Sequence, residues 1–387
     1  MARLHNINNK QQLNNLSSLE WDVLLDAAIK HGVAPLLYQR VKNLDSIPKD
    51  ILAGLGKAYY GNVLRNARYY QELSEILKQF QDNDIEVIVL KGAYLAKTVY
   101  QSDALRVIGD IDLMVKDLPK VQKLLLQLGY KQKKHNLSIE EQCLIHHCLI
   151  DFTKQGAFKI DVHWNLDVIF KINPDMLWQA AEPCTIGDIK VLSLSPEDLL
   201  FHVCFHAAYA NNFVGMRFLY DIEKTIAYYE IDWNLLFARA SVWQADKVVY
   251  LALYIAKDCL DAKVPDNVLK QFKPKDFNLE LVKTSKEIIS SNINSQICSI
   301  NLATLWMSNK SLRDKLSIII NRTFLSPKSL AILYNLPTNS WRVYFYYPVR
   351  LKYLLVRYTG IILGKNMQKL TAQNNKITSI LDWMKGI

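Results

Sequence analysis

Residues 109–115 read GDIDLMV, a short apolar segment interrupted by two aspartates. Short apolar runs bounded by polar residues are typical of buried strands. Side chains alternate between the two faces of a strand, so Asp110 and Asp112 are expected to share one face. Neighbouring carboxylates repel each other, and both stay ionised only where water or a cation fills the gap. The pair therefore predicts a site for Mg²⁺ (or Mn²⁺), cations that bind oxygen ligands.

A third carboxylate, Asp161, lies in another apolar segment, residues 158–164, which read FKIDVHW. Three aspartates on strands, two of them in a D-x-D pair, form the ligand set of a two-metal site for phosphoryl or nucleotidyl transfer. The alternative is a chance D-x-D pair at a strand end, because motifs this short are common. His163 shares a face with Asp161, so it could contact a nucleotide, orient Asp161 or be a hydrogen-bonded structural residue.

The sequence before the aspartates has the pattern of a strand, a tight turn and a helix. Residues 85–90 (IEVIVL) form a β-branched run that predicts a buried strand. Lys91 and Gly92 follow directly, and residues 93–100 are expected to be helical. A helix that begins after such a turn directs its backbone N–H groups towards an anion, and Lys91 would add a charge.

Further elements complete a small α/β module. Residues 119–128 predict a helix that ends at Gly129. Strands are expected near residues 144–153 and 158–164, joined by residues 154–157 (KQGA), whose composition suits a hairpin turn.

Helical sequence flanks this module on both sides. Helices are predicted over residues 18–29 and 51–83, and Ser195 has the position of an N-cap before Pro196. Helical periodicity continues to about Leu305. The predicted fold class is α+β, a small mixed-sheet module flanked by N-terminal and C-terminal helical domains. The predicted parts are residues 1–83 (N-terminal helices), 84–194 (α/β module), 195–310 (C-terminal helices) and 311–387 (basic, aromatic-rich tail).

The composition is that of a folded protein. Of the 387 residues, 50% are apolar and 22% are charged, which excludes a disordered or low-complexity chain. The six cysteines contain no C-x-x-C pair and are too few for a disulfide scaffold. We expect a cytoplasmic protein, because no signal peptide or membrane-spanning run is recognised. The P-loop and G-x-G-x-x-G motifs are missing from the sequence, so a P-loop kinase or dinucleotide enzyme is not supported.

The formal charge of +10 is concentrated at the C-terminal end. Residues 311–387 contain twelve Lys or Arg and two Asp, so residues 1–310 have no net charge. Trp341 and several tyrosines are interleaved with these charges. Two interpretations stay open. The aromatics could pack on the rest of the protein while the charges face water. Alternatively, the tail could meet an anionic partner, either a nucleic acid or, through residues 341–387, a membrane surface that would make the protein membrane-peripheral.

The order of these motifs resembles the little-characterised nucleotidyltransferase family of the DNA polymerase β-like superfamily. The resemblance rests on VIVLKG at residues 87–92, Arg106, GDIDL at residues 109–113 and IDVHW at residues 160–164, and it extends over roughly residues 20–280. It implies that the α/β module of residues 84–194 is a nucleotidyltransferase module.

The family resemblance implies transfer of a nucleoside monophosphate from an NTP to a hydroxyl group, with release of pyrophosphate. The implied metal ligands for Mg²⁺ (or Mn²⁺), which are also the catalytic residues, are Asp110, Asp112 and Asp161. Asp161 would accept the proton of the attacking hydroxyl. Lys91 and Arg106 would contact the triphosphate. The implied nucleotide-binding residues are Lys91, Gly92, Arg106, Gly109 and His163.

The acceptor stays open among a small molecule, a sugar, a protein hydroxyl and an RNA end. The neutral residues 1–310 argue against nucleic acid, because phosphate contacts require a basic groove. The alternative function is a non-catalytic nucleotide-binding or partner-platform protein. Clustered acids that repel each other argue against it. Arg217 and Asp221 are four residues apart, so they could form a helix ion pair or, with His206, close a cleft over the acceptor.

Overall fold

The computed structural model describes residues 16–132, 138–144, 146–290, 340–352 and 367–386, together with residues 327, 330, 331, 334 and 336. The chain divides into two compact units. The first comprises residues 1–133 and 142–290, and the second comprises residues 134–141 and 291–387. The helical periodicity predicted between residue 291 and Leu305 lies outside the described residues.

The first unit contains a mixed sheet of seven strands in the order β3-β4-β5-β2-β1-β7-β6. The strands are β1 (Val87–Val89), β2 (Ile111–Val115), β3 (Lys131–Gln132), β4 (Phe152–Thr153), β5 (Ile160–His163), β6 (Glu182–Ile186) and β7 (Ile189–Ser193). Strand β2 pairs antiparallel with β1 and parallel with β5, and β1 pairs parallel with β7. The predicted α+β class and mixed sheet are confirmed.

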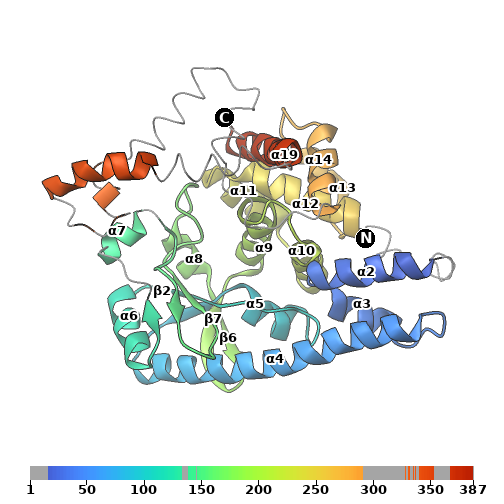
Figure 1. Ribbon diagram of the computed structural model, residues 1–387, viewed down its shortest axis with the longest axis horizontal. Coiled ribbons are helices and arrows are strands. Elements are labelled where there is room, and N and C mark those ends of the chain that lie inside the picture. Colours follow the sequence, from blue (N-terminus) through green and yellow to red (C-terminus); the bar gives the residue numbers. More distant parts are fainter. Residues whose placement is uncertain are drawn as a thin grey trace. The chain divides into compact units, whose positions relative to one another are not determined.

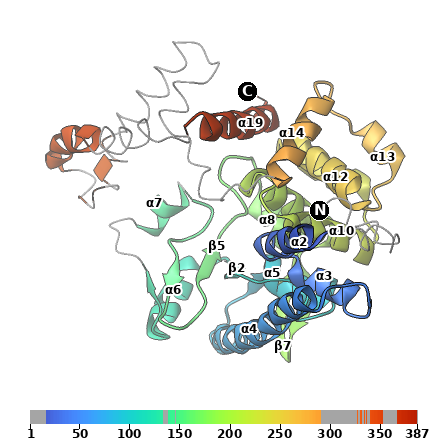
Figure 2. The same cartoon turned by 45° about the vertical axis from the view of Figure 1, so that its right-hand side comes forward.

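Helices precede, interrupt and follow these strands. Up to residue 290 they are α2 (Ser18–Lys30), α3 (Ala34–Val41), α4 (Lys49–Asp82), α5 (Lys91–Tyr94), α6 (Leu118–Gln127), α7 (Ile139–Cys143), α8 (Pro174–Ala180), α9 (Pro196–Phe205), α10 (Met216–Tyr228), α11 (Trp233–Val242), α12 (Asp246–Leu260), α13 (Asp266–Gln271) and α14 (Leu279–Ser290), with π-helical turns η2 (Leu95–Val99) and η3 (His206–Ala210). The long helix α4 runs past the sheet and contacts β7, and α2 and α3 pack on α4 (Figures 1 and 2).

Local capping explains where several helices begin and end. Ser17 and Glu20 form a reciprocal capping box before α2. The Ser195 hydroxyl accepts a hydrogen bond from the Asp198 backbone N–H at the start of α9, as predicted. Gly129 has a φ of +86° just after α6, a backbone conformation that favours glycine, and this confirms the predicted helix end.

The core of the first unit includes the strand that carries the D-x-D pair. All five residues of β2 are buried, among them Ile111 and Leu113 with no exposed surface. Asp112 is therefore a carboxylate in a wholly buried strand, and it needs polar partners there.

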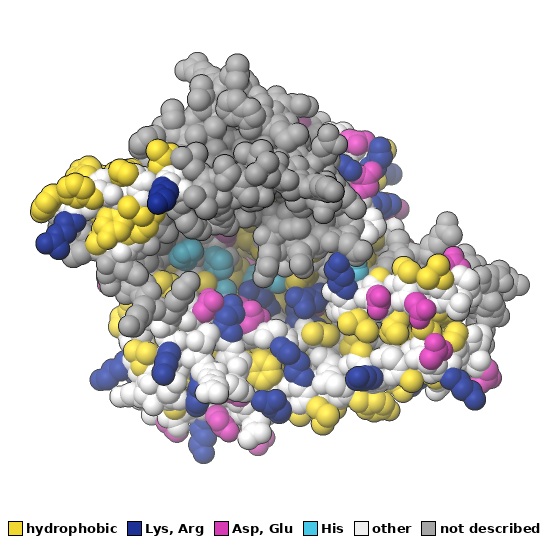
Figure 3. Space-filling model, viewed as in Figure 1, with side chains coloured by type: hydrophobic (Ala, Val, Ile, Leu, Met, Phe, Trp, Pro, Cys, Tyr) yellow, Lys and Arg dark blue, Asp and Glu magenta, His cyan; other side chains and the backbone are white. Residues whose placement is uncertain are grey.

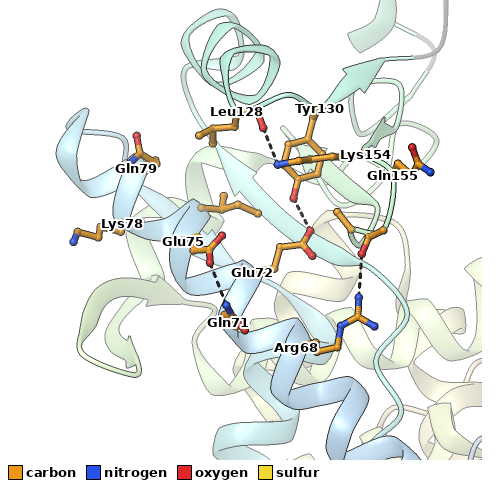
Figure 4. Close-up of a pocket in the computed structure, with 13 residues that line it drawn as sticks. Arg68, Gln71, Glu72, Glu75, Lys78, Gln79, Leu128, Tyr130, Lys154 and Gln155 are labelled. Carbon is orange, nitrogen blue, oxygen red and sulfur yellow. Dashed lines mark hydrogen bonds between the residues drawn. The ribbon is translucent and has the colours of Figure 1, made fainter.

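Polar side chains of α4 hold the turn between β4 and β5. Figure 4 shows Glu72 directed at Tyr130, whose hydroxyl donates to it, and Arg68, which donates to the Gly156 carbonyl at 3.1 Å. Glu72 also accepts the backbone N–H of Phe158 at 2.9 Å. These groups line a pocket of about 600 Å³. Since β5 begins two residues after Phe158, they fix the start of the strand that carries Asp161.

Two predicted elements differ in extent from the structure. The strand expected over residues 144–153 is reduced to β4, and the chain before it contains α7. There the buried Gln142 side chain accepts the backbone N–H of Ile150 at 2.9 Å, so a side chain replaces part of the strand ladder. The helix expected over residues 93–100 changes into the π-helical turn η2 at Leu95.

The second unit is described at residues 138–141, 340–352 and 367–386 and at a few single positions. The two longer stretches contain the 3₁₀ turn η5 (Trp341–Phe345) and helix α19 (Met367–Lys385). Val343 is buried with Leu330 and Ala331 in a small apolar cluster. The parts of the predicted tail at residues 311–326 and 353–366 lie outside the described residues. None of the described helices has the length and hydropathy of a membrane-spanning segment.

Candidate functional site

The three aspartates singled out by the sequence lie together. Parallel pairing of β2 with β5 sets Asp112 directly opposite Asp161, and Asp110 immediately precedes β2. One carboxylate oxygen from each of the three lies within 4.8 Å of the other two. Three acids at this spacing can share one cation or a pair of cations.

Lys91 brings a cation to this cluster from the end of β1. Its φ is +44°, a conformation that L residues other than glycine rarely adopt. Residues held in such conformations are concentrated at functional sites, where the surrounding structure maintains them. The Lys91 ammonium lies 2.6 Å from Asp112 Oδ1, and the backbone N–H of Leu90 donates to the Asp112 carbonyl at 3.1 Å. The turn after β1 thus places Lys91 on the buried acid.

His163 is the second partner of Asp112. Its Nε2 lies 2.9 Å from Asp112 Oδ1, and its ring stacks on His147 with centroids 5.2 Å apart. Burial acts to raise the pKa of Asp112, but Lys91 and His163 hold that pKa well below its ordinary value. Nδ1 of His163 is buried and has no hydrogen-bond partner. His163 therefore binds Asp112 through Nε2 in this structure, and its Nδ1 is left without a hydrogen bond.

Lys159 is a further residue of the site, and the sequence analysis missed it. Its ammonium lies 2.8 Å from Asp161 Oδ2 and 3.8 Å from Asp110 Oδ2. A usable signal was present, because Lys159 and Asp161 are two residues apart and so share a face of the strand. A protein cation thus lies between two of the three acids.

The donor set fits a divalent cation. Oδ1 of Asp161 is buried and has no hydrogen-bond partner, which leaves a carboxylate oxygen free to act as a ligand. Burial raises the pKa of Asp161 to about 6, although Lys159 opposes this. Burial and the Asp112 carboxylate raise the pKa of Asp110. Within the described parts of the chain, these aspartates are the one cluster of three or more His, Cys, Asp or Glu with this spacing.

Arg106 lies behind Gly92 in a buried ion pair. Its Nε and Nη2 donate to the two carboxylate oxygens of Asp221 at 2.8 Å each, and Tyr100 donates to the same carboxylate at 2.9 Å. A Cβ on Gly92 would lie 2.6 Å from Arg106 Nη1. The two Asp221 oxygens thus bind Arg106 and Tyr100, and the helix ion pair considered for Arg217 and Asp221 does not form.

Arg217 has a different environment. Its guanidinium lies over the Phe218 ring at 4.6 Å, and it makes no hydrogen bond or ion pair with any residue that the structure describes. Burial and the nearby Arg106 lower its pKa. His206 packs on the same Phe218 ring, with centroids 4.9 Å apart.

Gly109 has the least constrained position of the predicted site residues. It is exposed, and a Cβ built on it would meet no atom within 4 Å. Its carbonyl accepts a hydrogen bond from Arg65 at 3.4 Å. Packing therefore does not require a glycine at this position.

These features define a class: an α+β protein whose mixed sheet brings three aspartates together in a cluster that can bind a cation. Residues 17–261 match the model of a family described as uncharacterised nucleotidyltransferase, and the chain belongs to that family. The match includes the D-x-D pair, Asp161 and the helices from α2 to α12. No curated protein and no solved structure matches the chain.

Proposed function

We propose that the protein is a Mg²⁺-dependent (or Mn²⁺-dependent) nucleotidyltransferase that moves a nucleoside monophosphate from an NTP to a hydroxyl group. The observation that carries the proposal is the cluster of Asp110, Asp112 and Asp161 on paired strands, with one oxygen of Asp161 lacking a partner. Membership of a nucleotidyltransferase family supports it.

In the proposed reaction the acceptor oxygen attacks the α-phosphorus. A new O–P bond forms, the bond between the α-phosphorus and the oxygen bridging to the β-phosphate breaks, and pyrophosphate leaves. Mg²⁺ bound by the three aspartates would neutralise charge on the phosphate oxygens and lower the pKa of the acceptor hydroxyl. Asp161 takes the hydroxyl proton, because a carboxylate beside the acceptor oxygen can act as a general base. Lys91 and His163 keep Asp112 ionised and oriented.

The triphosphate carries several negative charges, so we expect basic side chains to contact it in addition to the metal. Lys91 and Arg106 are the sequence-based candidates, and each already binds a carboxylate in the structure. Arg217 lies one helical turn before Asp221 on α10, and its guanidinium has no acidic partner among the described residues. A partly buried cation of this kind is stabilised by an anion. We therefore include Arg217 with Lys91, Arg106, Gly92, Gly109 and His163 among the proposed nucleotide contacts.

The test of the Arg217 contact compares ATP with AMP, which lacks the β- and γ-phosphates. Arg217→Ala should weaken ATP binding by about tenfold or more, because the loss of one charge-assisted hydrogen bond reduces affinity by this amount. AMP binding should stay unchanged. Arg217→Lys should retain part of the ATP affinity, and Lys116→Ala, a change at an exposed lysine, should have no effect. Equal losses for ATP and AMP would exclude the triphosphate contact.

The proposed activity is tested by calorimetry with each of the four NTPs, in Mg²⁺ and in EDTA. Wild type should bind an NTP only with the metal, and Asp110→Asn/Asp112→Asn should lose that binding. Asp188→Asn, a change at an exposed acid in the β6–β7 turn, is the matched control. Failure of every NTP to bind in Mg²⁺ or Mn²⁺ would argue against the enzyme.

One observation favours the alternative of a non-catalytic nucleotide-binding or platform protein. Lys91 and Lys159 already neutralise Asp112 and Asp161, so the cluster is partly charge-compensated without a metal. Release of pyrophosphate separates the two functions. The enzyme should release it from the bound NTP when a hydroxyl acceptor is supplied, whereas a binding protein should bind the NTP and release none.

A further inference from the structure

Residues 340–352, which read SWRVYFYYPVRLK, carry large apolar side chains that face solvent. We propose that this segment is a docking surface for a lipid bilayer with anionic headgroups. The proposal concerns the second unit and does not depend on nucleotidyl transfer.

The inner side of the segment is anchored. Val343 is almost fully buried against Leu330 and Ala331, and Tyr346 and Tyr347 pack partly on the same cluster. Some of the tail aromatics therefore pack on other residues of the tail itself. This anchoring gives the segment a defined outer side.

The outer side carries several exposed apolar side chains. The rings of Trp341 and Phe345 lie 5.5 Å apart. The exposed fractions are 69% for Trp341, 61% for Tyr344, 63% for Phe345, 50% for Val349 and 45% for Leu351. Single exposed apolar residues are ordinary, but five large ones between residues 341 and 351 indicate an interaction site.

The charges on the segment have one sign. Arg342, Arg350 and Lys352 lie within it, and residues 340–352 contain no acid. Figure 3 shows hydrophobic side chains beside Lys or Arg side chains on this segment, at the left of the view. Tryptophan and tyrosine favour the boundary between water and hydrocarbon, and basic residues near that boundary are attracted to anionic lipid.

A bilayer fits this combination better than other occupants. A second copy of the chain would bring the same positive charges together. A nucleic acid could stack on the aromatic rings, but it would leave the aliphatic side chains of Val349 and Leu351 exposed. Lipid accommodates the aromatic rings, the aliphatic side chains and the basic residues in one interface.

The test uses the full-length protein and sedimentation with vesicles of phosphatidylcholine, with or without phosphatidylglycerol, at low and high salt. Wild type should bind the anionic vesicles, and salt should weaken that binding. Trp341→Ser/Phe345→Ser should lower the affinity by about tenfold or more, because two rings no longer enter the interface. Leu19→Ser/Leu64→Ser, which changes two leucines exposed to 72% and 70% on α2 and α4, is the matched control and should bind as wild type.

Three results would overturn the proposal. The first is equal binding of wild type and Trp341→Ser/Phe345→Ser to anionic vesicles. The second is wild-type binding to RNA oligonucleotides that competes with the vesicles and is tighter. The third is a concentration-dependent dimer that the double substitution abolishes. Circular dichroism and thermal unfolding of the variant check that the fold is unaffected.

Discussion

At the scale of single residues, two glycines near the acidic cluster differ in what they require. Gly92 lies against Arg106 Nη1 and Ile108, where a Cβ would meet atoms at 2.6 and 2.9 Å, whereas Gly109 lies next to open space. Only the first glycine is required by packing. The family resemblance implied that both glycines contact the nucleotide. The sequence does not distinguish them, because a motif does not show which side chains pack against each glycine in the fold.

This difference predicts unequal effects of alanine. Gly92→Ala should destabilise the protein by roughly 2 kcal/mol, because the new methyl group must displace a buried guanidinium. Gly109→Ala should change stability by less than about 0.5 kcal/mol. Urea unfolding of both variants measures this. A Gly92→Ala protein as stable as Gly109→Ala would contradict the close packing around Arg106.

His147 provides a prediction of pH dependence. Burial, His163 and Lys91 lower its pKa to about 3 from an ordinary value of 6.5. Below pH 6.5 the unfolded chain therefore binds a proton at His147 that the folded chain does not, so the free energy of unfolding falls as the pH falls towards 3. His147→Gln removes this contribution. Between pH ~6.5 and ~4.5 wild type should lose about 2 kcal/mol more than the variant.

The control for this experiment is His146→Gln, a change at the neighbouring, exposed histidine. Its stability should follow wild type across the same pH range. If His147→Gln and His146→Gln had the same pH profile, burial of the neutral His147 ring would not contribute to acid sensitivity.

At the scale of elements, the sequence predicts what depends on local chemistry. The N-cap at Ser195 and the helix end at Gly129 are confirmed, because a few neighbouring residues determine each of them. The D-x-D pair and Asp161 were found from their place in apolar runs. The short β4 and the helix α7 were not, because the buried side chain of Gln142 replaces ladder hydrogen bonds there, and only the tertiary structure brings it to Ile150.

Contacts between distant elements could not be predicted from the sequence for the same reason. Asp221 on α10 bonds to Arg106, which is 115 residues earlier, whereas the sequence suggested a partner four residues away. Helix periodicity shows which residues share a face, but it does not show what packs on that face. The pair joins the loop before the D-x-D strand to the C-terminal helices.

The buried Arg106–Asp221 ion pair should stabilise the fold, because it links the loop before β2 to helix α10. Asp221→Asn should destabilise the protein by about 3 kcal/mol, because it leaves a buried guanidinium without its counter-charge. Arg106→Met/Asp221→Leu should be less destabilised than Asp221→Asn, since no charge remains buried.

Glu86→Gln, at an exposed ion pair with Lys116, is the control and should change stability by less than about 1 kcal/mol. Chemical denaturation provides the measurement. A double variant no more stable than Asp221→Asn would show that the buried charge is not the cause.

At the scale of the whole molecule, the net positive charge and the candidate active site lie in different parts of the chain. The acidic cluster belongs to the neutral residues 1–310, and the net positive charge belongs to residues 311–387. The division at residues 83, 194 and 310 stays a prediction, and the Arg106–Asp221 pair crosses the second of these boundaries. We therefore propose that the α/β module and the C-terminal helices fold as one cooperative unit, while the basic tail serves a separate interaction.

The acidic cluster should couple metal binding to the stability of the first unit. Burial and Asp112 raise the pKa of Asp110, so the fold disfavours its negative charge when no cation is bound. Without metal, Asp110→Asn should therefore be at least as stable as wild type. With Mg²⁺ at about 100 times its dissociation constant, wild type should gain roughly 2.7 kcal/mol, and Asp110→Asn should gain little. Asp188→Asn should respond to Mg²⁺ as wild type does. Thermal unfolding with and without Mg²⁺ or Mn²⁺ measures these differences, and a wild type that neither metal stabilises would count against a cation site at the three aspartates.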